Sequence, residues 1–553
     1  MPYGISHAQT PQLPGSADPS RLQERLLIPQ TEQAQDIIAP EDIEIDDTIP
    51  QNPEGFVLEG IALEGVTAFE ENHFNDLIAE YMYLPVDINT LNHLAARITK
   101  IYRDTGYFLS RAVIPQQEVT DGVVIIKVIE GHVGNVILVD SEGLLKKDRL
   151  GIVQKTIRKI ETLDPLHGPT LERYVLLLND HMGLTIQNIL QAPSVPSEAG
   201  SVDVILRVLP NTKQQVSLAY NNHGSRFVGP HQVTGTYQRA GLFNTFDLIT
   251  VQGTTSVPMS EVQFGSMSYA LPLNEEGLTA SFLASYSNSE PGLSLRDLEV
   301  EGDSATLSAS LTYPLIRSRK TSLFLGSSFE IRNSATEFLD EELIDDKMRK
   351  LSIFANYNTQ DTWGGISDIN LSLSKGLDIF AATETGEDNL SRAQGRSDFI
   401  KAEINASRQQ DLGQGFQVIN SLAAQYSPHP LLSSEEFGYG GTSFGRAYDP
   451  SELTGDQGVA TAIEVLYTDV DTITDLNLKL VPFAYYDIGK VWNEDRGSEP
   501  VSGASAGFGT YYNFNNRVNG QLQFAFPLTK SVSTPIMNGD NSPRILFSLN
   551  TSL

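Results

Sequence analysis

The strongest constraint on the fold is a repeated alternation that runs from residue 211 to Leu553. Segments with an apolar residue at every second position are separated there by turn residues. In SATLSASLTY, Leu307 and Leu311 fall on one side of an extended chain, whereas Thr306 and Ser308 fall on the other. This pattern predicts β-strands, each with one apolar face and one face of small polar residues. Half-buried strands of a soluble protein also alternate, so a single segment does not choose between the two settings.

The number and the spacing of these segments favour a membrane barrel. We count about sixteen, an even number as in bacterial barrels. They begin near residues 216, 233, 247, 262, 278, 304, 322, 350, 368, 398, 416, 459, 479, 504, 518 and 545. Connections after even-numbered segments are short and those after odd-numbered segments are mostly long, as in outer-membrane barrels with tight periplasmic turns. The final strand, RILFSLNTSL, suits a barrel closed by its last strand.

Composition excludes several classes of function. The balance of 38 Lys+Arg against 69 Asp+Glu gives a net charge of −31, which repels nucleic acid. The chain has no cysteine, so disulfides, thiolate nucleophiles and zinc sites with Cys ligands are excluded. No stretch reaches the roughly 18 apolar residues of a membrane-spanning helix. The nine His are scattered, and we read Asp469, Asp471 and Asp475 as a solvated turn, so no metal, nucleotide or other cofactor is expected.

Residues 55–210 contain two copies of one element order. In residues 55–131, the strand FVLEGIALEG precedes two helical segments and the strands FLSRAVIP and VVIIKVIEG. Residues 132–210 repeat this order, from the strand VGNVILVD to the strands LTIQNILQA and VDVILRVL. The repeated β-α-α-β-β unit predicts two tandem α+β domains.

The first 54 residues are polar around one amphipathic island. Asp18 before Pro19 has the form of an N-cap with proline at the first helical position. We expect a short helix over about residues 18–30, then an acidic linker. Three leucines share one face of that helix: Leu22, Leu26 and Leu27. Near the start, SHA resembles a signal-peptide cleavage site, and an ordinary polar tail is the alternative.

Over nearly its whole length, the chain resembles the two-partner secretion transporters, the TpsB or ShlB/FhaC/HecB family of haemolysin and haemagglutinin exporters. The two repeats look like the family's polypeptide-transport-associated (POTRA) domains. YRDTGYFLSRAVIPQQEVTDGVVIIKVIEGHVG is similar to the signature passage of the first domain. The matching positions are Gly106, Tyr107, Pro115, Gln116, Asp121, Gly122, Glu130 and Gly131.

The longest predicted loop contains FGYGGTSFGRAYDPSELTGDQG, which resembles the family's sixth-loop signature, usually Val-Arg-Gly-Tyr. Arg446 and Tyr448 match it, whereas Gly445 stands in place of Val and Ala447 in place of Gly. We expect Ala447 to make the loop tip less able to adopt a left-handed backbone conformation.

The thirteenth predicted strand contains FAYYDIGKVW, which matches the family's aromatic-x-Asp-x-Gly pattern at Tyr485, Asp487 and Gly489. The resemblance implies that the loop folds into the barrel and that Arg446 pairs with Asp487 on the inner wall. It also implies that the first helix is a removable plug.

A possible catalytic motif is set aside. Gly441-Thr442-Ser443-Phe444-Gly445 has the form G-x-S-x-G, but that nucleophile elbow needs a strand-to-helix turn in an α/β sheet. The predicted setting is a glycine-rich loop between barrel strands, so we expect no catalytic residues and no enzyme activity.

The resemblance implies a pore in the outer membrane, in contact with its lipid, that exports a large unfolded exoprotein. The POTRA domains would lie in the periplasm and recognise the partner's N-terminal secretion domain, with no nucleotide involved. One alternative is a barrel-assembly factor of the same superfamily, and another is a passive porin. Two POTRA domains instead of three or five argue against the first, and tandem capture domains argue against the second.

Overall fold

The computed structural model describes residues 13–26, 48–50, 52, 55–70, 72–193, 198–339, 341–494, 499–535 and 542–553. The chain forms two compact units. The larger comprises residues 1–31, 212–273 and 277–553, and the smaller comprises residues 32–211 with 274–276. Within the described ranges, no helix is both long enough and apolar enough to cross a membrane.

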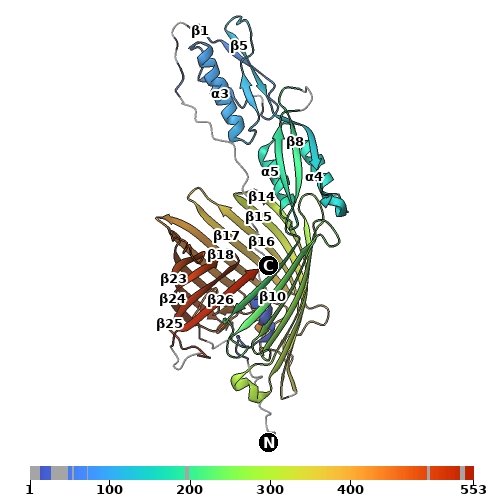
Figure 1. Ribbon diagram of the computed structural model, residues 1–553, viewed down its shortest axis with the longest axis vertical. Helices are drawn as coiled ribbons and strands as arrows, with labels where there is room; N and C mark the ends of the chain where they lie inside the picture. The colour runs from blue at the N-terminus through green and yellow to red at the C-terminus, as the bar shows by residue number, and fades with distance from the viewer. Residues whose placement is uncertain are drawn as a thin grey trace. The chain divides into compact units, whose positions relative to one another are not determined.

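The first repeat of the smaller unit follows the predicted element order (Figure 1). Its elements are β1 (Phe56–Val57), β2 (Gly60–Glu64), α2 (Asn75–Ala79), β3 (Pro85–Val86), α3 (Ile88–Asp104), β4 (Arg111–Val113) and β5 (Val123–Ile129). Strand β5 lies at the centre of a sheet, parallel to β2 and antiparallel to β4. Helix α3 begins at a capped turn, where Asp87 Oδ1 accepts a hydrogen bond from Thr90 N at 2.9 Å.

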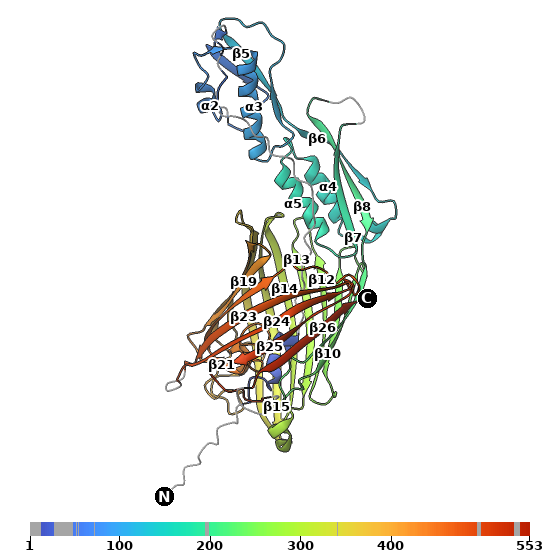
Figure 2. The same ribbon diagram turned by 60° about the vertical axis from the view of Figure 1, so that its left-hand side comes forward.

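The second repeat has the same topology, which confirms the predicted β-α-α-β-β duplication. Its elements are β6 (His132–Val139), η2 (Leu144–Lys147), α4 (Ile152–Glu161), α5 (Gly168–Asn179), β7 (Leu184–Gln191) and β8 (Ser201–Pro210). Strand β8 is central, parallel to β6 and antiparallel to β7. Helices α4 and α5 lie beside this sheet (Figure 2).

Sixteen antiparallel strands close into a barrel, as predicted. They are β9 (Gln214–Asn221), β10 (Gln232–Ala240), β11 (Leu248–Ser256), β12 (Val262–Pro272), β13 (Thr279–Ser289), β14 (Glu301–Arg317), β15 (Thr321–Phe338), β16 (Glu341–Gln360), β17 (Gly365–Gly376), β18 (Ile400–Gly413), β19 (Phe416–Tyr426), β22 (Gln457–Tyr467), β23 (Leu478–Trp492), β24 (Val501–Phe514), β25 (Val518–Pro527) and β26 (Arg544–Ser552). The last strand pairs with the first, from Ser548 opposite Asn221 to Ser552 opposite Ser217. A short 3-10 helix, η3 (Leu293–Leu298), lies in the connection before β14.

Only β16 begins far from its predicted position. It starts at Glu341 instead of near residue 350, so the long loop predicted between β15 and β16 is part of these two strands. The added stretch, EELIDDKMRK, is polar on both faces and pairs with β15. Apolar alternation cannot reveal such a stretch, because a strand outside the apolar layer needs no apolar face.

The two faces of the wall differ as the alternation predicts. Leu307 and Ile353 are 58% and 57% exposed on the outer face, whereas Thr306 and Ser352 are buried on the inner face. Because small polar side chains line the interior, space remains there for chain segments that are not barrel strands.

Candidate functional site in the barrel lumen

The longest connection between barrel strands folds back into the barrel. Loop 6, residues 427–456, joins β19 to β22. It contains η4 (Ser433–Glu435) and a hairpin of β20 (Phe437–Tyr439) and β21 (Leu453–Gly455). Both hairpin strands lie against β23, and Tyr439 is fully buried there. The loop is thus a packed component of the barrel interior.

Arg446, between the two hairpin strands, meets Asp487 on β23. Arg446 Nε and Nη2 donate to Asp487 Oδ2 and Oδ1 at 3.2 and 2.9 Å, and the backbone N of Arg446 donates to Oδ2 at 3.0 Å. Ser505 Oγ on β24 donates a further hydrogen bond to Oδ2 at 3.2 Å. Asp487 is 0% exposed. A bidentate pair of this kind is strong and directional, so it fixes the position of the loop tip on the wall.

A second carboxylate and an aromatic ring complete the surroundings of Arg446. Its Nη1 donates to Glu464 Oε2, and its Cζ lies 3.4 Å from the centre of the Tyr485 ring. Tyr511 Oη donates to the other oxygen of Glu464 at 2.8 Å. Glu464 was not among the residues predicted from the sequence. Strand parity could have found it, because Glu464 is opposite Tyr485 in register and therefore shares the inner face with Asp487.

The glycines around Tyr439 explain the departure from the usual loop signature. Gly445 has a φ of +68°, so within the signature the left-handed residue is this glycine, and the tip adopts that conformation without a glycine at position 447. A Cβ on Gly445 would lie 2.6 Å from the Tyr439 ring, and one on Gly503 would lie 2.7 Å from it. A Cβ on Gly489 would also collide with this ring. The buried tyrosine therefore occupies the space that three glycines leave free.

The residues after Arg446 bind other parts of the wall. Ala447 is 0% exposed, and the buried Tyr448 donates from Oη to Ala504 O on β24 at 2.9 Å. Asp449 Oδ1 lies 3.1 Å from Arg544 Nη1 on β26. The loop tip thus contacts β23, β24 and β26, which all lie on one side of the barrel.

The predicted first helix lies inside the barrel (Figure 2). It comprises η1 (Pro19–Arg21) and α1 (Leu22–Leu26), with Asp18 Oδ1 accepting from Ser20 N at 2.9 Å as the cap. Leu22 is 1% exposed and packs with Phe227, Val228 and Val262, and Leu26 is partly buried against the same cluster. Leu27 and the predicted helix end near residue 30 lie outside the described residues.

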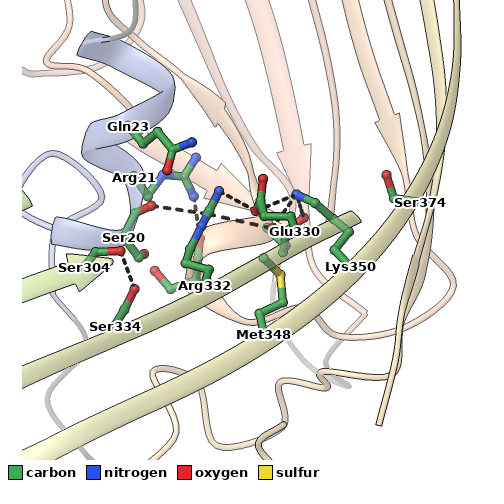
Figure 3. Close-up of polar contacts among 12 residues, drawn as sticks. Ser20, Arg21, Gln23, Ser304, Glu330, Arg332, Ser334, Met348, Lys350 and Ser374 are labelled. Carbon is green, nitrogen blue, oxygen red and sulfur yellow. Dashed lines mark hydrogen bonds and ion pairs between the residues drawn. The ribbon is translucent and has the colours of Figure 1, made fainter. Parts of the chain in front are cut away.

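Hydrogen bonds connect this helical segment to the wall and to loop 6. Arg332 Nη1 on β15 donates to Ser20 O at 3.3 Å, and Ser285 Oγ on β13 donates to Gln23 Oε1 at 3.1 Å. Arg21 Nη1 and Nη2 donate to Ser433 O and Glu436 O at 2.7 and 2.9 Å. Figure 3 shows Ser20, Arg21 and Gln23 beside Arg332.

In the smaller unit, Glu130 of the signature passage anchors the first repeat internally. Its Oε1 accepts from Thr67 N at 2.8 Å, Ala68 N at 3.0 Å and Tyr102 Oη at 2.6 Å. Burial raises the pKa of Glu130, but the hydrogen bonds from Thr67, Tyr102 and Ala68 outweigh it, so the pKa lies below its usual 4.5.

Other signature residues lie where the two repeats meet. Gly168 N donates to Gly106 O at 2.9 Å, and Leu166 N donates to Gly131 O at 2.6 Å. The Tyr107 ring lies 5.2 Å from the His167 ring. These contacts join the residues that follow α3 and β5 to the residues at the start of α5.

The remaining signature positions have local contacts. Gly122 has a φ of +69° in the turn before β5. Pro115 and Gln116 precede Gln117, whose side chain binds the backbone of Ile125. Its Oε1 accepts from Ile125 N at 2.7 Å, and its Nε2 donates to Ile125 O at 2.8 Å.

The set-aside serine does not lie at a strand-to-helix turn. Ser443 lies in loop 6 between β20 and β21, and no helix follows it before β21. Among the described residues, no group of three His, Asp or Glu side chains could hold a metal ion.

The fold and the site together define a class: a transmembrane β-barrel with two POTRA-type repeats and an inward-folded loop and helix. The family model for the haemolysin secretion/activation protein ShlB/FhaC/HecB matches residues 200–510, and the ShlB-type POTRA model matches residues 56–131. The chain belongs to this ShlB/FhaC/HecB family of the outer membrane, with its POTRA domains in the periplasm.

Individual relatives are distant in sequence. The heme/hemopexin transporter protein HuxB of Haemophilus influenzae is 22% identical over 386 residues, which is 69% of this chain and 66% of that protein. The outer membrane transporter CdiB of Dickeya dadantii is 24% identical over 426 residues, 73% of this chain and 71% of that protein. The structure of CdiB from Escherichia coli has a TM-score of 0.75 at 18% identity, covering 93% of this chain and 94% of that one. At 18% identity, the likeness to this CdiB structure shows a shared fold.

Proposed function

We propose that this chain is a two-partner secretion pore that exports a large exoprotein, unfolded, across the outer membrane. Membership of the ShlB/FhaC/HecB family supports export over barrel assembly. The observation that carries the proposal is a barrel whose interior holds a short, separately tethered helix and a loop fixed by a buried ion pair. A passive porin has no need of either.

In this proposal, residues 55–131 and 132–210 form two domains that capture the partner's N-terminal secretion domain. Their sheet orders leave β2 and β4 at the edges of the first sheet and β6 and β7 at the edges of the second. An extended chain can add to such an edge through main-chain hydrogen bonds, which give affinity with little demand on sequence.

The captured chain then enters the lumen and displaces the helix formed by η1 and α1. Loop 6 stays on the wall, with Arg446 paired to Asp487, and keeps the same position while the exported chain passes through the lumen. No catalytic step is needed, because folding of the exported protein outside prevents its return.

A secretion assay tests the proposal. The chain is expressed with the large secreted protein encoded beside its gene, and that protein is followed across the outer membrane. Release that requires the barrel and is lost on deletion of residues 55–209 is the expected result. Unchanged release, together with defects in the assembly of other barrels, would instead support the assembly-factor alternative.

A further inference from the structure

A second buried charge lies at the other end of loop 6. Glu435, in η4, has a side chain that is 0% exposed. Its carboxylate oxygens lie 3.0 and 3.2 Å from Lys350 Nζ, and Oε2 lies 2.9 Å from Lys401 Nζ. Arg332 Nη1 is 3.8 Å from Oε1. One loop carboxylate is therefore surrounded by three cations.

All three cations belong to the barrel wall, on β15, β16 and β18. They are separated from Asp487 in strand order, because the strands run β15-β16-β17-β18 and then β19 and β22 before β23, which carries Asp487. Loop 6 is thus attached to two different parts of the wall, at Glu435 and at Arg446.

The carboxylates of the wall do not balance the charge of its three cations. Glu330 lies 2.9 Å from Arg332 and 3.5 Å from Lys350, and Glu403 lies 3.2 Å from Lys401. Two wall carboxylates face three wall cations, so the wall's side of the cluster has one positive charge in excess, which Glu435 balances. Figure 3 shows Glu330 between Arg332 and Lys350 on the inner wall. A buried cation without a partner is costly, so this imbalance favours a bound carboxylate.

We propose that Arg332, Lys350 and Lys401 form a carboxylate-binding site on the barrel wall, and that Glu435 is the positioning residue that holds the first half of loop 6 in it. The inference rests on the proposed function, in which loop 6 stays seated during export.

The same site also contacts the removable helix. Arg332 Nη1 donates to Ser20 O at 3.3 Å as well as facing Glu435. When the helix leaves, Arg332 loses the carbonyl of Ser20, and loop 6 loses the two hydrogen bonds from Arg21. The ion pairs between Glu435 and the wall cations remain. The loop therefore remains bound at this site after the helix has been displaced.

Cysteine accessibility in the full-length protein tests the inference, because the native chain has no cysteine to react. Two reporters are introduced singly at buried positions of loop 6. Ser434→Cys, at a residue 3% exposed, reports on the Glu435 end, and Ala447→Cys, at a residue 0% exposed, reports on the Arg446 end. Labelling by a membrane-impermeant maleimide is followed on cells without an exoprotein.

Glu435→Gln removes the loop carboxylate while nearly keeping its shape. The matched control, Glu403→Gln, removes one negative charge from the same cluster but leaves Glu435 in place. Folding of each variant is checked by the heat-dependent gel mobility of the barrel. We expect Glu435→Gln to raise labelling at Ser434→Cys at least about tenfold and to leave Ala447→Cys within about twofold, because a buried pair loses one partner at one end only. Under Glu403→Gln, the Ser434→Cys reporter should stay within about twofold.

Two results would overturn the inference: unchanged labelling in a folded Glu435→Gln barrel, or an equal rise in the Glu403→Gln control. Because labelling needs no exoprotein, a failure of the proposed function is read separately. Normal secretion by both Glu435→Gln and Arg446→Ala, despite increased loop labelling, would contradict the role of loop 6 in export. It would not contradict the proposed binding of Glu435 to the wall cations.

Discussion

The two inserts in the barrel are held in different ways. Loop 6 is fixed through buried charges: Arg446 on Asp487 and Glu464 at one end, and Glu435 among three wall cations at the other. The helix of η1 and α1 is held by hydrogen bonds in which at most one partner is charged, and by one buried leucine, Leu22. A hydrogen bond with one charged partner contributes about 1.5–3 kcal/mol, whereas breaking a buried ion pair costs about 3–5 kcal/mol. The contrast supports the proposal that the helix leaves during export and the loop stays.

Arg446→Ala should have the largest effect. It leaves Asp487 and Glu464 buried without their cation, which costs about 3–5 kcal/mol for the seated loop. We expect secretion to fall at least about 100-fold while the barrel still assembles. Secretion is measured by immunoblot of the medium, and assembly by gel mobility. Normal export would show that the buried pair is not needed.

Gly445→Val should come next. It restores the usual residue of the family signature, but here the new side chain meets the Tyr439 ring at a position with positive φ. We expect a loss of secretion of about tenfold, since strain and overpacking cost about 1–3 kcal/mol each. The double variant Gly445→Val/Tyr439→Ala should recover part of it. Without such recovery, the clash is not the cause.

Leu22→Ala should act on the helix alone. Losing its packing against Phe227, Val228 and Val262 should raise the frequency of channel opening in planar bilayers by about tenfold, because truncation of a buried leucine costs about 2–5 kcal/mol. Leu26→Ala, at a partly buried position, is the matched control and should have a smaller effect. Labelling at Ala447→Cys should not change. A parallel rise there would mean that the helix and loop leave together.

Glu130→Gln should have the smallest effect, because this carboxylate is partly solvated, unlike Asp487. With its folded pKa below 4.5, Glu130 stabilises the first repeat fully above about pH 4.5 and loses that contribution as the pH falls below it. Hydrogen-exchange protection of α3 and β5 should therefore drop on acidification in the native chain and drop less in the variant. Equal pH dependence in both would contradict the assignment.

Much of the architecture follows from local pattern. The sixteen strands and the duplicated repeat were predictable because alternation and element order are properties of neighbouring residues. The polar start of β16 was not, because EELIDDKMRK is a strand only through its pairing with β15.

The site was predictable only in part. The positions of Arg446 and Asp487 came from a resemblance. Glu464 was missed although strand parity places it on the inner face. Glu435 was missed because its role depends on which strands the loop reaches, and no sequence spacing encodes that. The same holds for Tyr439, whose place is set by glycines on the loop, β23 and β24.

Tethering the helix tests the central claim most directly. Gln23→Cys and Ser285→Cys, whose native side chains are hydrogen-bonded at 3.1 Å, are joined by a short cleavable thiol cross-linker in the otherwise cysteine-free chain. The account predicts that secretion of the partner stops on cross-linking and returns on cleavage, while either single cysteine treated alike secretes normally. Normal secretion by the cross-linked protein would contradict it, because the exported chain would then pass with the helix still in the lumen.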